Sequence, residues 1–170
     1  MDKLIITNDD LRRIVSGICR SISTSNWRPD YIVGITRGGL VPAVMISHWF
    51  NVPMHTLNVS LRDSTTGPES NLWMAEDAFG YNSEPKNILI VDDINDSGAT
   101  MNWIMDDWRA SCFPQGERWD KTWNNNVRFA VLVDNSASDC SVAMDYIGMS
   151  VNKAEKDVWI EFPYENWWQY

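Results

Sequence analysis

The chain has 170 residues, enough for one domain with a hydrophobic core, and its apolar content of 44% argues against a disordered protein. The net charge of −9, without any basic run, argues against nucleic acid as the main partner. The three scattered cysteines exclude a disulfide framework or zinc site and suit a reducing cytoplasm, and we expect neither a membrane span nor a signal peptide.

The first predicted element is an amphipathic helix that begins near Thr7, where Asp10 suits a capping box. Its apolar residues recur at helical spacing: Leu11, Ile14, Val15, Ile18 and Ile22. We expect a polar connector at 21–29 and then a first core strand at 31–35.

This strand leads into a turn with two consecutive glycines, Gly38 and Gly39, which Arg37 precedes. A helix follows to about Phe50, with Pro42 in its first turn. Paired glycines let backbone amides converge on an anion, and the arginine adds positive charge. The alternative interpretation is a tight turn with a solvated arginine.

A further strand is predicted at 54–59, and residues 60–86 after it show little periodicity. Structureless segments of this length are usually functional, often as a lid over a ligand. Arg62 is the residue of this segment best suited to meet a phosphate. The alternative is an insertion without a role.

The most informative stretch is 88–100, where an apolar run is followed by polar residues. The run from Ile88 to Val91 suits a strand that is buried on both faces, as in a parallel sheet. A helix comes next, because apolar residues recur at helical spacing at Met101, Ile104, Met105 and Trp108. The turn between them lies at the carboxyl end of the strand, where open parallel sheets bind ligands.

The residue types in this turn predict a phosphate site beside an acidic site. The predicted phosphate cradle at the start of the helix consists of Ser97, Gly98, Ala99 and Thr100. Asp92 and Asp93 would repel a phosphate and instead suit sugar hydroxyls or a hydrated Mg²⁺. Asp96 lies between the two groups and can reach a reacting atom. The alternative is a capped turn with solvated acids.

The remaining chain adds strands without a second domain. Residues 111–126 look like a surface excursion, and a buried strand at 129–133 then brings Asp134 and Asn135 to the same edge of the sheet. Another strand is predicted at 143–147.

The stretch from Val91 to Thr100 resembles the phosphoribosyl-pyrophosphate (PRPP) motif of the type I phosphoribosyltransferases. The turn at Arg37, Gly38 and Gly39 resembles the pyrophosphate loop of the same family. Residues 31–42 as a whole are especially similar to the bacterial xanthine–guanine phosphoribosyltransferases within it. Residues 158–163 resemble their base-binding segment. The resemblance covers most of the chain, roughly residues 7–167 outside two variable stretches.

The resemblance implies an α/β fold in one domain over residues 1–170, with a central parallel sheet flanked by helices. It also implies a mobile lid at about 60–86 and a small hood from the termini, with the C-terminal segment at about 150–170. The implied activity is Mg²⁺-dependent transfer of the 5-phosphoribosyl group from PRPP to a nucleobase, with release of pyrophosphate in nucleotide salvage. A 6-oxopurine such as hypoxanthine or guanine is the expected base, and a homo-oligomer, a dimer or tetramer, is the expected assembly.

The resemblance also implies roles for individual residues. Asp92 and Asp93 would hold the ribose and the metal, and Asp96 would be catalytic, because it faces the base and can accept its proton. The residues expected to bind PRPP are Arg37, Gly38, Gly39, Arg62, Asp92, Asp93, Asp96, Ser97, Gly98, Ala99 and Thr100.

The base site is expected at Trp159, which would stack on the ring, and at the backbone of Ile160, which would read its edge. In the purine enzymes, the strand matched by 129–133 ends near a lysine that donates to the exocyclic oxygen of the base. Here Asp134 and Asn135 stand instead. An amide can donate or accept, so we expect Asn135 to read the base, with a weaker preference for an oxo group than lysine provides.

A second class of function stays open. Some proteins of this fold keep PRPP or nucleotide binding as a regulatory signal without significant transfer, because a fold does not determine a function. The acidic composition disfavours a regulator that binds nucleic acid, and Asp96 with the predicted lid favours an enzyme.

Overall fold

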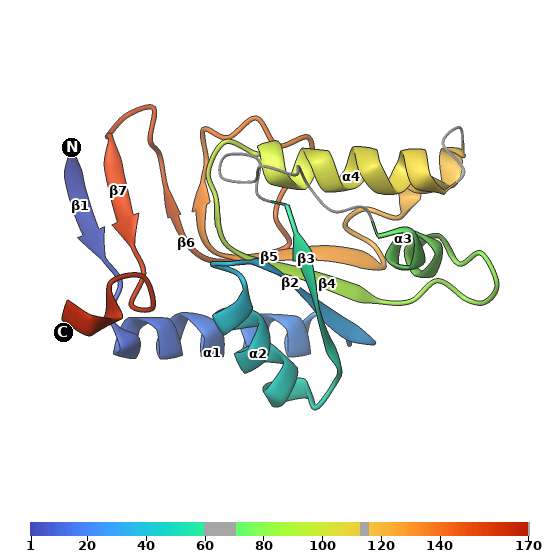
Figure 1. Cartoon of the computed structure of the whole chain (residues 1–170), viewed down its shortest axis with the longest axis horizontal. Helices are drawn as coiled ribbons and strands as arrows, with labels where there is room; N and C mark the ends of the chain where they lie inside the picture. Colours follow the sequence, from blue (N-terminus) through green and yellow to red (C-terminus); the bar gives the residue numbers. More distant parts are fainter. Residues whose placement is uncertain (60–70, 113–115, 170) are drawn as a thin grey trace.

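The computed structural model describes residues 1–59, 71–112 and 116–169, and its centre is a parallel sheet. Five strands form this sheet in the order β3-β2-β4-β5-β6, and helices lie on both of its faces (Figure 1). The strands are β2 (Tyr31–Thr36), β3 (Met54–Asn58), β4 (Ile88–Asn95), β5 (Val127–Asn135) and β6 (Tyr146–Val151). The predicted α/β fold with a central parallel sheet is confirmed.

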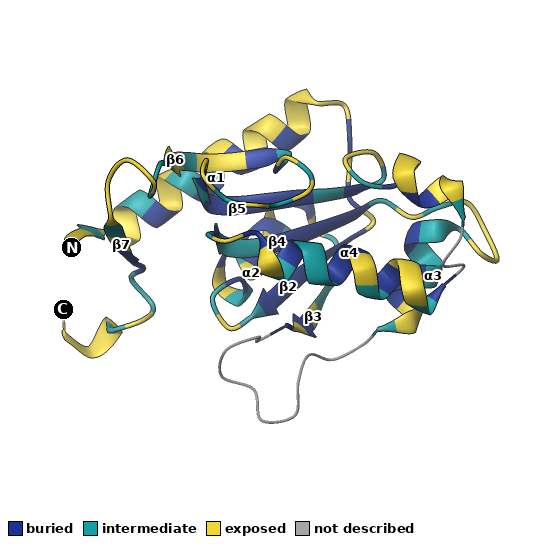
Figure 2. Ribbon diagram, turned by 90° about the horizontal axis from the view of Figure 1, so that it is seen from above, coloured by how far each residue is buried: buried dark blue, intermediate teal, exposed yellow. Residues whose placement is uncertain are grey.

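The central strand β4 shows why the sheet is buried on both faces. Ile88 and Ile90 belong to the core on one side, whereas Leu89 and Val91 belong to the core on the other. Because successive side chains alternate across a strand, the unbroken apolar run fills both cores. All four side chains are at most 1% exposed, and Figure 2 shows the central strands β4 and β5 largely in the colour of buried residues.

The helices divide between the two faces of the sheet. One face packs against α1 (Asn8–Thr24) and α2 (Leu40–Phe50), and the other packs against α3 (Leu72–Phe79), α4 (Ala99–Ser111) and the 3-10 helix η1 (Glu117–Lys121). The predicted apolar face of α4 is confirmed as buried at Met101, Ile104, Met105 and Trp108. Among the described residues, no helix has both the length and the apolar character that a membrane span requires.

Helix α1 begins where the sequence predicts and ends later. Asp10 N–H donates to Thr7 Oγ1 (3.1 Å), and Thr7 N–H donates to an Asp10 carboxylate oxygen (2.9 Å), which is the expected capping box. The helix then runs into the connector predicted at 21–29. Ile22 is fully buried, so its packing carries the helix on to Thr24.

Helix α3 corrects the expectation that residues 60–86 lack regular structure. Residues 60–70, which include Arg62, lie outside the described residues, so a lid over PRPP stays a prediction there. The second half of the segment forms α3, with Met74 and Ala78 buried in the core. This helix has only eight residues, too few for a clear periodic pattern.

The segment predicted as a surface excursion, 111–126, sends a large side chain into the core. Trp119 of η1 is fully buried, and its indole N–H donates to Cys112 O (2.7 Å). Its ring stacks on that of Trp123, with 5.3 Å between centroids. One buried side chain in an otherwise polar segment produces no apolar periodicity. The sequence of 111–126 therefore does not reveal that Trp119 lies in the core.

Strand β6 lies further along the chain than the strand predicted at 143–147. It pairs in parallel with β5, with Tyr146 opposite Ala130 and Val151 opposite Asn135. Because β6 is an edge strand, it is less buried than β4. It therefore needs fewer apolar residues, and its limits are harder to predict from the sequence.

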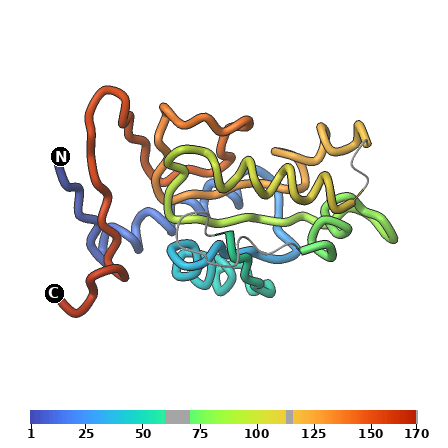
Figure 3. The backbone as a smooth tube through the Cα atoms, turned by 45° about the horizontal axis from the view of Figure 1, so that its top comes forward, coloured from blue at the N-terminus to red at the C-terminus, as the bar shows by residue number. Residues whose placement is uncertain are grey.

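The two ends of the chain form the hood. β1 (Asp2–Ile5) pairs in parallel with β7 (Val158–Glu161) in a separate two-stranded sheet, and Figure 3 shows both terminal segments side by side. Lys3 of β1 forms an ion pair with Glu161, whose side chain is only 3% exposed. After β7 the described chain ends in the 3-10 helix η2 (Trp167–Gln169).

We predict that Trp119→Ala lowers the free energy of unfolding by about 3–5 kcal/mol, the usual cost of deleting a buried tryptophan side chain. Trp168→Ala is the control, because Trp168 is 63% exposed and surface substitutions usually change stability by less than about 0.5 kcal/mol. Urea unfolding followed by circular dichroism measures both variants. Equally small effects would contradict the anchoring role of Trp119.

Candidate active site

One large cleft lies between the hood and the carboxyl ends of the strands. Its volume is about 1190 Å³, and its walls come from the ends of β2, β3 and β4, the starts of α2 and α4, and the segment around β7. The parallel register brings these ends together, because Gly34 of β2 pairs with Val91 of β4 and Thr36 of β2 pairs with Asn58 of β3. Open parallel sheets bind ligands at this edge.

The turn between β2 and α2 forms one wall of the cleft through Arg37 and Gly38. The peptide bond before Arg37 is cis. A Cβ atom at Gly38 would collide with the carboxylate of Asp93, so the turn can lie against β4 only because position 38 has no side chain. Gly39 lies below the wall, where its N–H donates to Ile35 O (2.8 Å). The structure thus brings Arg37 and Gly38, but not Gly39, to the cleft.

The four residues of the predicted phosphate cradle line the cleft at the start of α4: Ser97, Gly98, Ala99 and Thr100. Gly98 has a φ of 88°, and a Cβ atom there would collide with the backbone of Cys140. The N-cap residue is this glycine, which has no side chain that could cap the helix. Ser97 caps it in part, because its Oγ accepts from Ala99 N–H (3.2 Å). The amides of the first turn and the helix dipole favour an anion here.

Asp92 and Asp93 line the cleft from β4 itself, which continues as a strand to Asn95. Asp93 N–H donates to Asp92 Oδ1 and Ile94 N–H donates to Asp93 Oδ1, both at 2.8 Å. Burial, and after it the neighbouring Asp93 carboxylate, raises the pKa of Asp92 well above its usual range. Burial likewise raises the pKa of Asp93. No cationic side chain of the described residues is among the causes that shift the pKa of Asp92 or Asp93, so the protein itself does little to neutralise this pair of carboxylates.

The chemistry of this donor set fits Mg²⁺, which prefers oxygen ligands and keeps several of its waters. Two neighbouring, partly buried carboxylates need a positive counter-charge. Within residues 1–59, 71–112 and 116–169, no group of three or more His, Cys, Asp or Glu side chains is arranged to hold a metal ion. An ion at Asp92 and Asp93 would therefore complete its shell with water and substrate oxygens.

The segment after β7 adds two residues that no sequence pattern indicates, Tyr164 and Glu165. Burial, followed by the charges of Asp93 and Asp92, raises the pKa of the Tyr164 hydroxyl, which is buried with no hydrogen-bond partner among the described residues. Burial also raises the pKa of Glu165, and Asp93 adds to this effect. Their position depends on the pairing of β1 with β7, which a local pattern does not reveal.

Asp96 lines the cleft, and Asn135 braces it from the end of β5. Asn135 Nδ2 donates to Asp96 O (2.9 Å), and its Oδ1 accepts from Ala137 N–H (3.2 Å) and Lys153 N–H (3.0 Å). Asn135 is 6% exposed and is not part of the cleft wall. This arrangement does not support the expectation that Asn135 reads the base, because both ends of its amide are used inside the protein.

Lys153, in the connection between β6 and β7, lines the cleft, whereas Asn135 does not. Its Nζ lies 3.1 Å from Asp96 Oδ1, and its side chain is 20% exposed. Asp134, which stands where the resemblance places a lysine, accepts a hydrogen bond from Asn95 Nδ2 (2.9 Å). No sequence pattern indicates Lys153, because it belongs to a charged connector, where lysines are usually solvated.

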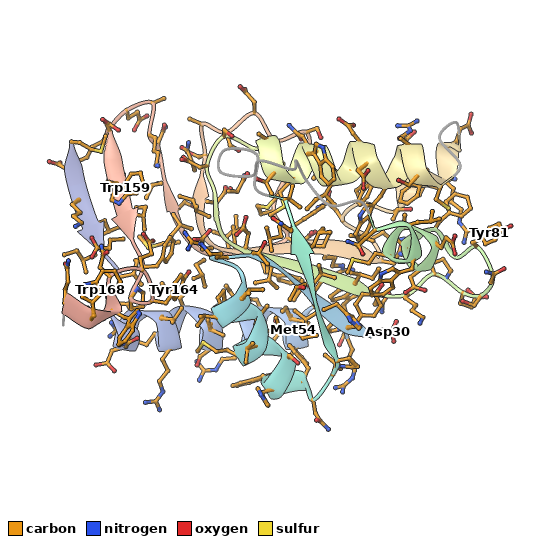
Figure 4. All side chains as sticks on the ribbon, in the orientation of Figure 1. Asp30, Met54, Tyr81, Trp159, Tyr164 and Trp168 are labelled. Carbon is orange, nitrogen blue, oxygen red and sulfur yellow. The ribbon has the colours of Figure 1, made fainter. Side chains whose placement is uncertain are left out.

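Trp159 and Ile160 of β7 complete the cleft on the hood side, and Figure 4 labels Trp159 there. Trp159 is 50% exposed, whereas Ile160 is 5% exposed. An accessible indole in a cleft wall offers a flat surface to a ring system. The structure thus brings two of the three predicted base-site residues, Trp159 and Ile160, into one cleft with Asp96 and Lys153.

A model of the phosphoribosyl transferase domain matches residues 5–165 of this chain. The chain belongs to this family. The glycine turn after β2, the acid pair and the start of α4 all lie within the matched residues.

Known members share low sequence identity with this chain. Xanthine phosphoribosyltransferase 1 of Saccharomyces cerevisiae is 25% identical over 123 residues, which cover 61% of this chain and 59% of that protein. Bifunctional protein PyrR of Citrifermentans bemidjiense is 24% identical over 161 residues, which cover 87% of this chain and 83% of that protein. A purine phosphoribosyltransferase from Pyrococcus horikoshii, known from a crystal structure, is 24% identical in sequence. The match covers 98% of this chain and 96% of that chain with a TM-score of 0.67, so the two share a fold.

We predict that Asp92→Asn stabilises the ligand-free protein at neutral pH. A raised pKa in the folded state means that folding penalises the ionised carboxylate, and asparagine removes the charge with little change of shape. The gain should be largest above the raised pKa and should vanish below about pH 4, where the unfolded carboxyl is protonated as well. A gain of about 1 kcal/mol raises the melting temperature of a domain this size by about 2–4 °C.

Calorimetric melting of the wild type and the variant across this pH range measures the effect. Asp106→Asn makes the same chemical change at an exposed position of α4 and is the control. A lower melting temperature for Asp92→Asn than for the wild type at neutral pH would show that the charge supports the fold.

Proposed function

We propose that this protein transfers the 5-phosphoribosyl group of PRPP to a ring nitrogen of a 6-oxopurine, such as hypoxanthine or guanine, and releases pyrophosphate in purine salvage. The observation that carries the proposal is one cleft in which two glycine-containing turns, an acid pair and an accessible indole meet, with Asp96 in the same wall. The family match over residues 5–165 supports phosphoribosyl chemistry. The name of the yeast relative supports a purine base.

The two turns divide the phosphates of PRPP between them. The start of α4, residues 97–100, holds the 5′-phosphate with backbone amides and hydroxyls. Arg37 and Gly38 hold the pyrophosphate, where a guanidinium supplies charge-assisted hydrogen bonds and the glycine lets the backbone approach. Arg62 lies outside the described residues, so its contact with the phosphates stays a prediction. Because the chain carries a net charge of −9, these local groups must attract the anion.

Asp92 and Asp93 hold Mg²⁺ and the ribose hydroxyls. Mg²⁺ held by these two carboxylates would supply positive charge for the pyrophosphate as it leaves. It would also compensate the acid pair, in which burial, and after it the charge of Asp93, raises the pKa of Asp92. The buried Tyr164 hydroxyl next to the acid pair provides a further donor for an oxygen of the substrate.

The transfer step should resemble glycoside chemistry, with an oxocarbenium-like transition state. The protein contributes by positioning two substrates and stabilising charge. Asp96 accepts the proton of the ring nitrogen, because its main chain is fixed by Asn135 and its carboxylate lies 3.1 Å from the Lys153 ammonium. Trp159 stacks on the base and the backbone of Ile160 contacts its edge.

The alternative is a protein that binds PRPP or a nucleotide as a regulatory signal. The similarity to Bifunctional protein PyrR over 87% of this chain favours this alternative. Asp96 favours an enzyme, because a sensor has no need of a proton acceptor in the cleft. The cytoplasmic location and the homo-oligomer expected from the sequence stay predictions.

An assay of pyrophosphate release separates the two functions. The wild-type protein is incubated with PRPP, Mg²⁺ and one base at a time: hypoxanthine, guanine, xanthine, adenine, uracil or orotate. We predict release with hypoxanthine or guanine, with formation of an equal amount of the nucleoside monophosphate. PRPP binding without release for any base would favour the regulator, and turnover of a pyrimidine alone would contradict the purine assignment.

We predict that Asp96→Asn lowers kcat by about 10²–10⁴-fold, the usual contribution of general acid–base catalysis. The affinity for PRPP should change much less, because Asp96 acts on the base. Steady-state kinetics and PRPP titration measure the two effects, with Asp106→Asn as the control. Equal losses of kcat and of PRPP affinity would make Asp96 a binding residue.

A further inference from the structure

We propose that Lys153 identifies the base by donating a hydrogen bond to its exocyclic oxygen, and that Asn135 positions Lys153 beside Asp96 for this purpose. The inference rests on the proposed function and assigns the preference for an oxo group to one side chain. It moves the base-reading group from the end of β5 to the connection between β6 and β7.

Lys153 is the cation of the cleft that the phosphate turns do not use. Among the described residues that line the cleft, Arg37 and Lys153 alone carry a cationic side chain. Arg37 belongs to the turn after β2, next to the acid pair. Lys153 instead contacts Asp96 and shares the wall with Trp159, so its charge serves the base rather than the pyrophosphate.

The structure holds this lysine in a fixed place. Its side chain is 20% exposed, and its Nζ lies 3.1 Å from Asp96 Oδ1. Lys153 N–H donates to Asn135 Oδ1 (3.0 Å), while Asn135 Nδ2 donates to Asp96 O (2.9 Å). One buried amide therefore ties together the main chains of both members of the ion pair. This brace sets the spacing between the ammonium and the carboxylate.

An ammonium beside a carboxylate matches one edge of a 6-oxopurine. Lysine offers three donors and no acceptor, and the ion pair with Asp96 occupies one of these donors. The exocyclic oxygen of a 6-oxopurine lies beside N7, so the oxygen can accept from Lys153 while Asp96 accepts the N7 proton, which the base loses as its N9 bonds to the ribosyl carbon. A 6-aminopurine places a donor in front of the ammonium, which leaves polar groups unpaired and penalises binding.

Neither residue at the end of β5, Asp134 or Asn135, lines the cleft. The Asp134 carboxylate only accepts, and it is bonded to Asn95 Nδ2 (2.9 Å). The Asn135 amide is used at both ends by Asp96 and Lys153. The connection that leads into Trp159 therefore carries the donor.

Calorimetric titration with the product nucleotides inosine monophosphate and adenosine monophosphate tests the proposal without relying on turnover. We expect the wild type to bind the inosine nucleotide more tightly than the adenosine nucleotide. Lys153→Met keeps an apolar stem but removes the donors, so binding of the inosine nucleotide should weaken by about 10- to 100-fold, as expected for a hydrogen bond to a charged group. Binding of the adenosine nucleotide should not weaken, and Lys153→Arg should retain the preference.

Two further variants separate recognition from general effects on the fold. Lys156→Met is the matched control, because Lys156 lies in the same connection with 72% of its side chain exposed. It should keep the wild-type ratio of the two affinities. Asn135→Ala should lower this ratio while PRPP affinity is retained, and an unchanged ratio would overturn its positioning role. Circular dichroism confirms that each variant is folded.

The outcomes distinguish this proposal from the proposed function. The same preference in the wild type and in Lys153→Met would overturn the role of Lys153, and so would a wild type that does not discriminate between the nucleotides. If Lys153→Met loses the preference but no base supports pyrophosphate release in the wild type, the base-reading role stands and the transferase function fails.

Discussion

The contact of Gly38 with the Asp93 carboxylate sets the geometry on which the cleft depends. β2 and β4 are neighbouring strands, and the turn after β2 folds onto the acid pair because position 38 carries no side chain. An anion in the glycine turn is therefore placed beside a cation at the acid pair. β4 also leads directly into the start of α4, so all three binding elements meet at one edge of the sheet.

Negative charge in this cleft is compensated only in part by the protein. Burial and the neighbouring carboxylate raise the pKa of Asp92, and burial raises the pKa of Glu165 in the hood above it. Under the proposed function, a bound cation and its phosphate ligand would complete the balance. Binding would then be coupled to folding, because ligands that bind the folded state increase its stability. The paired Lys153 and Asp96 are the part of the cleft that already balances its charge.

Features that depend on local pattern could be predicted from the sequence. The apolar run of β4 and the helical spacing of α4 identify a strand, a turn and a helix. The end of the strand carries the acid pair, and the turn after it carries the predicted phosphate cradle. Features that depend on tertiary contacts could not be predicted. Lys153 lines the cleft and Asn135 does not, because the β6–β7 connection is hydrogen-bonded over the end of β5. Tyr164 reaches the acid pair only through the pairing of the two chain ends.

Titration of PRPP with Mg²⁺ against the wild type and Gly38→Ala tests most directly whether the two turns form one site. A methyl group at position 38 collides with the Asp93 carboxylate, whereas a methyl group at Gly17 in α1 meets no atom within 4 Å, which makes Gly17→Ala the control. We predict that Gly38→Ala weakens PRPP binding by about tenfold or more, equivalent to about 1.4 kcal/mol, and that Gly17→Ala binds like the wild type. PRPP binding to Gly38→Ala with wild-type affinity would contradict the joint site.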